Sequence, residues 1–99
     1  MMNEYERLRR QAERYREIYQ PGTRVLLLDM KDPYAPVPTG TRGTVVYVDD
    51  QAQIHMKWDN GSSLALIPDT DAFRTLTEGE LAEEQNNGVD ESDTPVMEM

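Results

Sequence analysis

The chain has 99 residues, a formal net charge of −9 and no cysteine. This length suits one small domain, and without thiols the chain cannot form a disulfide scaffold, a thiolate metal site or a cysteine nucleophile. No apolar run reaches the roughly 20 residues that span a bilayer, and no apolar segment of the secretory type stands near the first residue. We therefore expect a cytoplasmic protein that does not associate with a membrane.

The negative charge is concentrated at one end of the chain. Residues 1–20 carry five arginines and four glutamates, residues 21–76 carry five cations and seven carboxylates, and residues 77–99 carry eight carboxylates and no cation. We expect a helix, a nearly neutral domain and an acidic, largely disordered tail in these three parts, with a brief helix over residues 77–85. A nearly neutral domain argues against direct binding of nucleic acid, which needs a basic footprint.

Residues 3–19 are predicted to form an amphipathic helix. Asn3 is a suitable N-cap, and apolar residues recur at spacings of three and four. The residues of this stripe are Tyr5, Leu8, Ala12, Tyr15 and Tyr19. The stripe has two interpretations: it packs on the rest of the domain, or it is a surface for a partner or for self-association, which tyrosines suit.

The β-region begins with a strand and a long loop. Residues 23–28 are predicted to form the first strand, with Val25 and Leu27 directed inward. Residues 29–42 follow as the loop, because three prolines and Gly40 are incompatible with a helix or a central strand.

A three-stranded meander is predicted next. Residues 43–48 are β-branched and aromatic, and residues 53–58 alternate between apolar and polar side chains, as in a strand with one buried face. The inward positions of this second strand are Ile54, Met56 and Trp58. Asp49 and Asp50 form the turn between the two strands.

Further turn and strand signals complete the predicted fold. Asn60-Gly61 favours a type I′ hairpin turn, since both residues tolerate positive φ, and residues 64–66 resume the alternation. Residues 68–73 indicate a single helical or 3₁₀ turn, and residues 74–76 indicate a short closing strand. This order is that of an SH3-like barrel. The predicted fold class is therefore mainly β: a five-stranded SH3-like barrel with an N-terminal α-helix and a disordered acidic C-terminal tail.

Several motifs between residues 21 and 68 also carry a family resemblance. They are PGTRV, DPY, GTRGTV, a VDD turn, IHMKWDNGS and LALIP. In these motifs the sequence resembles a family of small bacterial and phage proteins catalogued as domain of unknown function 4314. The resemblance implies an SH3-like barrel, carriage on phages or other mobile elements, and a bacterial host cytoplasm. It implies no reaction and no catalytic residue.

The residues themselves point to no catalytic, cofactor or metal site. His55 is the only histidine, and strand alternation directs it outward with no nucleophile nearby. The aspartates stand in turns, where Asp is favoured for backbone reasons, and their spacing is not that of an EF-hand. We therefore predict a protein that is not an enzyme and uses neither cofactor nor metal.

The first functional hypothesis is a non-catalytic protein-binding module of a phage or mobile element. In its most concrete form it inhibits a basic, nucleic-acid-handling host protein, as an anti-CRISPR protein would, by offering carboxylates in place of phosphates. The candidate partner-binding residues are Asp32, Tyr34, Asp49, Asp50, Asp59, Tyr5, Tyr15 and Tyr19. The acidic tail either steers such a partner or only keeps the domain soluble.

Two alternatives remain open. The first is a nucleic-acid-binding SH3-like barrel in mobile-element replication or transfer. It requires a basic surface, for which the candidates are Arg7, Arg10, Arg14, Lys57 and Arg24. The second is an SH3-type adaptor that binds peptides in an aromatic groove containing Tyr34, Tyr47 and Trp58. The alternation of the strand favours core packing for Trp58 over that groove.

Overall fold

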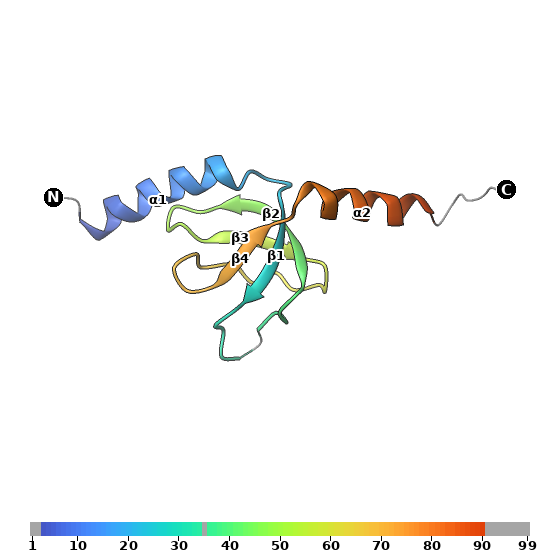
Figure 1. Ribbon diagram of the computed structural model, residues 1–99. Coiled ribbons are helices and arrows are strands. Elements are labelled where there is room, and N and C mark those ends of the chain that lie inside the picture. The colour runs from blue at the N-terminus through green and yellow to red at the C-terminus, as the bar shows by residue number, and fades with distance from the viewer. Residues whose placement is uncertain (1–2, 35, 91–99) are drawn as a thin grey trace.

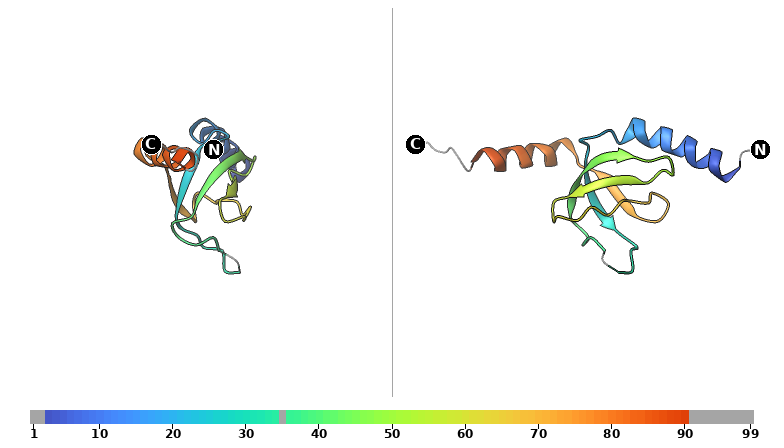
Figure 2. Two further views of the ribbon diagram at one scale, coloured as in Figure 1. Left: turned by 90° about the vertical axis from the view of Figure 1, so that its right-hand side faces the viewer. Right: turned by 180° about the vertical axis from the view of Figure 1, so that it is seen from behind.

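A computed structural model describes residues 3–34 and 36–90. The four strands form one antiparallel sheet in the order β3-β2-β1-β4, and a helix stands at each end of the chain (Figure 1). The elements in chain order are α1 (Glu4–Ile18), β1 (Arg24–Asp29), β2 (Arg42–Val48), β3 (Ile54–Trp58), β4 (Ala72–Thr75) and α2 (Glu78–Asp90). The two helices leave the domain in opposite directions (Figure 2).

The helix α1 begins where the sequence predicts. The Asn3 side chain accepts a hydrogen bond from the Glu6 backbone N–H at 2.8 Å, which satisfies one of the donors left open in the first turn. Ala12 is fully buried, and Tyr15 and Tyr19 pack against the core. The C-terminal half of α1 therefore covers the sheet beside β2 (Figure 1), whereas Tyr5 remains 64% exposed.

The inward face of the sheet follows the predicted alternation. Val25 and Leu27 of β1 are fully buried, as are the inward residues of β3, and Trp58 is 2% exposed. Gly43 of β2 pairs with Trp58 across the strands. A Cβ atom at Gly43 would lie 2.5 Å from Cε3 of Trp58, so the indole ring occupies the space that a larger residue would need.

The predicted closed, five-stranded barrel is wrong. The return segment makes only one isolated bridge, between Ile54 and Leu66, so the sheet has four strands and is open. The turn after β3 is not the predicted type I′ turn, which requires a positive φ at both central residues. Gly61 has a positive φ (+95°), but Asn60 does not. The Leu64 carbonyl accepts a hydrogen bond from the Trp58 indole N–H at 2.9 Å, so this part of the segment bonds to a core side chain instead of a strand.

The last part of the domain also differs from the prediction. The turn after Leu66 covers residues 68–70 only, and β4 begins at Ala72, where it pairs with β1. Phe73 was predicted in the helical turn but lies opposite Leu27 in the sheet and packs against the core.

The acidic tail contains a longer helix than predicted. Thr77 and Glu80 form a reciprocal capping box, with the Glu80 N–H donating to Thr77 Oγ1 at 3.1 Å and the Thr77 N–H to Glu80 Oε1 at 2.8 Å. From this cap α2 extends to Asp90, so residues 86–90 are helical and not disordered. The predicted disorder of residues 91–99 lies outside the described residues. Within the described part of the chain, neither helix has the length and apolar character needed to cross a membrane.

Candidate functional site

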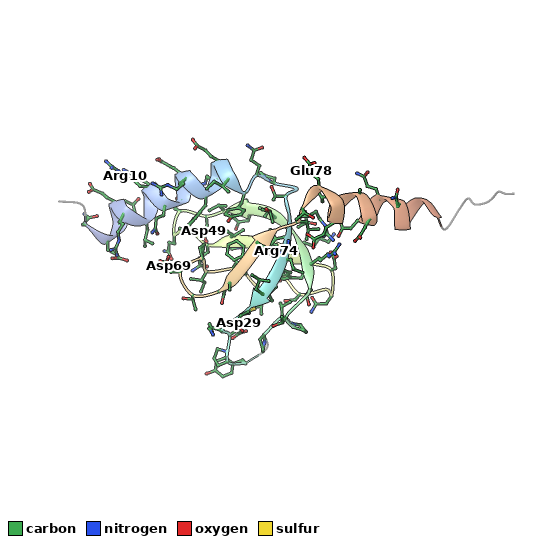
Figure 3. The ribbon with its side chains drawn as sticks, viewed as in Figure 1. Arg10, Asp29, Asp49, Asp69, Arg74 and Glu78 are labelled. Atoms are coloured by element: carbon green, nitrogen blue, oxygen red, sulfur yellow. The ribbon has the colours of Figure 1, made fainter. Side chains whose placement is uncertain are left out.

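Three of the predicted partner-binding carboxylates form pairs within the chain. Asp59 forms a bidentate ion pair with Arg24 at 2.9 and 2.7 Å. Asp50 pairs with Arg16 of α1 at 2.7 Å. Asp49 lies 2.9 Å from the His55 ring nitrogen, at the turn below α1 in the view of Figure 3. These carboxylates hold the turns and α1 in place.

The pKa values of two of these groups reflect the pairing. Burial alone would raise the pKa of Asp49, but hydrogen bonds from His55 and from two backbone N–H groups of the turn lower it. The Arg24 guanidinium lowers the pKa of Asp59. Both carboxylates therefore remain charged at neutral pH and stay bound to their partners in the chain.

The three tyrosines of α1 have different environments. Tyr19 lies between the rings of Tyr15 and Phe73, with centroid distances of 6.1 and 5.5 Å, and burial followed by the proximity of Tyr15 raises its pKa. Tyr5 is exposed, and the Arg9 guanidinium lies 5.6 Å from its ring centroid. Of the predicted tyrosine surface, Tyr5 is exposed, whereas Tyr15 and Tyr19 are partly buried against the core.

Asp32 and Tyr34 lie together on the long loop. The Asp32 carboxylate accepts a hydrogen bond from the Tyr34 backbone N–H at 3.2 Å, as in an Asx turn. Tyr34 is 92% exposed, whereas Val37 is 3% exposed and anchors the loop in the core.

An apolar groove lies between this loop and residues 64–71. It encloses about 380 Å³. The apolar side chains that line it are Met30, Pro33, Leu64, Ala65 and Ile67. We call this feature the groove.

Asp71 fixes the two walls of the groove relative to each other. It is 8% exposed. One of its carboxylate oxygens accepts a hydrogen bond from the Lys31 backbone N–H and the other from the Ile67 backbone N–H, each at 2.9 Å. The loop on one side and the turn on the other are thus joined by one buried side chain, and the groove is formed in advance of any ligand.

The histidine has the outward position that the alternation predicts. His55 stacks on Tyr47, with ring centroids 4.3 Å apart and planes inclined by 4°, and it pairs with Asp49. Within residues 3–34 and 36–90, no three His, Cys, Asp or Glu side chains come together as a metal site would require.

Sequence reasoning missed the ion pairs that attach α2 to the sheet. Glu84 contacts Arg24 at 2.6 Å and Arg42 at 3.1 Å, and Glu80 forms a bidentate pair with Arg74 at 2.9 Å. In Figure 3, Arg74 lies close to the start of α2, where Glu78 is labelled. The spacing of four residues between the two glutamates places them on one helix face, and this was the available signal; their partners lie up to 60 residues away.

The architecture defines a small β-rich module with an N-terminal helix, a four-stranded antiparallel sheet and a short C-terminal helix. Residues 8–76 match the family described as "Domain of unknown function (DUF4314)", and the chain belongs to this family, which confirms the resemblance in the sequence. The match includes most of α1 and ends before α2. No curated protein and no solved structure matches the chain.

Proposed function

We propose that this chain is a non-catalytic protein-binding module of a phage or mobile element, and that it binds an extended segment of its partner in the groove. The observation that carries the proposal is the groove itself. Its lining is mostly apolar, its walls are fixed by Asp71, and it has the size of known ligand pockets. A few convergent polar groups at its edge, including Asp32, would orient the ligand.

The backbone beside the groove supports an extended ligand. Leu66 forms a bridge with Ile54, so the backbone groups of the preceding Ala65 point away from β3. Ala65 makes no backbone hydrogen bond within the described residues. An incoming strand would pair with Ala65 and place alternate side chains among the apolar residues of the groove, which is recognition by strand addition.

We further propose that the open sheet is a variant of the SH3-like barrel. Adding residues 64–66 beside β3 gives the order 64–66, β3, β2, β1, β4. The groove nevertheless differs from an aromatic groove for proline-rich peptides, because Trp58 is buried and no aromatic side chain is among the described residues that line the groove. The ligand class is therefore a segment with alternating aliphatic side chains.

For the inhibitor form of the hypothesis, two exposed glutamates of α2 are additional candidates beside the predicted carboxylates. Asp49, Asp50 and Asp59 form pairs within the chain. Glu78 and Glu83 on α2 are exposed. If the partner is a basic host protein, we propose that these glutamates steer the encounter while the groove provides specificity.

A peptide selection tests the groove. Peptides selected from a displayed random library on the full chain should carry alternating aliphatic residues, and Ile67→Asp should weaken their binding at least tenfold. Ile67 is 44% exposed and lines the groove, so the change adds a charge there without removing core volume. Ile18→Asp on α1 is the matched control, since Ile18 is 53% exposed. Equal binding by both variants would contradict the proposal.

A further inference from the structure

The outward face of the sheet collects basic side chains. Cross-strand pairing places Lys57 opposite Thr44 and Thr44 opposite Arg24. A second row joins Arg42 and Arg74 through Leu26, which pairs with both. Because directly paired residues share one face of a sheet, the four cations lie in two adjacent rows, about 7 Å apart along the strands.

The net charge of residues 21–76 does not reveal this concentration of cations on one face. Residues 21–76 contain five cations, and four of them project from this one face, one from each strand. We call the set of Arg24, Arg42, Lys57 and Arg74 the cationic face. The carboxylates that neutralise it come from the turn after β3, through Asp59, and from α2.

The first turns of α2 pair with three arginines of the cationic face through their carboxylates. Glu84 binds Arg24 and Arg42, and Glu80 binds Arg74 with two parallel hydrogen bonds. No α2 residue whose side chain the structure describes belongs to the core, and Leu81 is 37% exposed. The attachment therefore rests on carboxylate–guanidinium pairs, which are frequently bidentate, as phosphate–guanidinium pairs are.

An aromatic pair stands on the same face. Tyr47 and His55 are stacked, and Tyr47 is 50% exposed. His55 lies two residues before Lys57 on β3, so the pair continues the line of cations along the sheet. Cations beside an exposed aromatic ring are the elements with which proteins bind single-stranded nucleic acid, through phosphate contacts and base stacking.

We propose that the cationic face is a binding site for single-stranded nucleic acid and that the carboxylates of α2 occupy three of its arginines in the isolated protein. Release of Glu80 and Glu84 frees Arg42 and Arg74 for phosphates, while Arg24 keeps Asp59 as its partner. Lys57 and the Tyr47 ring extend the site. This activity is separate from peptide binding, because the groove is lined by residues of the long loop and of segment 64–71.

Fluorescence anisotropy with a labelled oligothymidylate and the full chain tests the proposal. Glu80→Gln/Glu84→Gln should bind the oligonucleotide at least tenfold more tightly than wild type. Glu78→Gln/Glu83→Gln is the matched control, because it removes the same charge from exposed positions of the same helix and should gain much less. Two new phosphate contacts, from Arg42 and Arg74, would add about 1.4 to the magnitude of the slope of log affinity against log salt, since each single-stranded contact contributes roughly 0.7.

Two further variants localise the site. Adding Arg42→Gln to Glu80→Gln/Glu84→Gln should reverse the gain, and adding Tyr47→Ala should weaken binding severalfold by removing the stacking ring; Tyr5→Ala, on exposed α1, should change nothing. Far-ultraviolet circular dichroism verifies that each variant is folded. Equal affinity of the two double glutamate variants, or a gain that survives Arg42→Gln, would overturn the proposal. Equal competition by a duplex of the same length would overturn the single-strand preference.

Discussion

The two helices are attached to the same sheet by different forces. The helix α1 buries Ala12 completely and packs Tyr15 and Tyr19 on the core, so most of its attachment is apolar. The helix α2 is attached by the pairs of Glu80 and Glu84 with three arginines. Apolar contacts are barely sensitive to salt, whereas exposed ion pairs weaken as salt rises and as carboxylates protonate. The comparison indicates that apolar packing attaches α1 to the sheet, whereas ion pairs attach α2.

Removing the largest inward side chain should have the largest effect. Trp58→Ala should cost about 3–5 kcal/mol of the free energy of unfolding, which approaches the whole stability of a small domain. Trp58 is 2% exposed, and its indole N–H donates to the Leu64 carbonyl. Urea denaturation followed by circular dichroism measures the loss. Trp58→Phe should cost clearly less, and a loss below about 1 kcal/mol for Trp58→Ala would show that this face is not the core.

Adding a methyl group at Gly43, where the Trp58 indole leaves no room, should lower the free energy of unfolding by a smaller amount. Gly43→Ala places a Cβ atom 2.5 Å from Trp58 Cε3, so the ring must move, and overpacking of this kind costs about 1–3 kcal/mol. Gly79→Ala on α2 is the matched control, since the nearest atom to its Cβ would be 3.9 Å away. Urea denaturation should separate the two variants. Equal stability would mean that the core adapts without cost.

Acid should detach α2 while the domain stays folded. The bidentate Arg74 pair and the Thr77 backbone N–H lower the pKa of Glu80 from 4.5 to about 2, and Arg24 lowers that of Glu84. A lowered pKa stabilises the docked helix above pH 4.5, and this stabilisation is lost as pH falls toward about 2. The Arg74 Nε–H resonance in a nuclear magnetic resonance titration should follow this loss. The step should be absent in Glu80→Gln, and its persistence there would assign it to another group.

Local patterns in the sequence predicted most of the inward face. The alternation of Ile54, Met56 and Trp58 follows directly from strand geometry, and the cap at Asn3 depends on residues three positions apart. Such relations between residues that are close in sequence can be read directly from the sequence. The resemblance to the family then rested on motifs within the same region.

The remaining features depend on contacts between distant residues. The predicted return strand does not form because the Leu64 carbonyl accepts its hydrogen bond from the Trp58 indole N–H. The groove depends on Asp71, which accepts hydrogen bonds from the backbone N–H groups of Lys31 and Ile67. The acidic composition of the tail predicted disorder. Composition alone does not show which arginines of the sheet will pair with its glutamates. The pairing of Glu84 with Arg24 spans 60 positions, and it becomes visible only when the strands are in register.

Amide hydrogen exchange at low and high salt tests the contrast between the two helices most directly. We predict that raising salt from about 0.05 to about 0.5 M, which shortens the Debye length to about 4 Å, lowers the protection of the α2 amides severalfold. The amides of α1 around Ala12 and of β1 should be unaffected. Unchanged protection of α2, or an equal loss in α1, would contradict the conclusion that ion pairs attach α2 and apolar packing attaches α1.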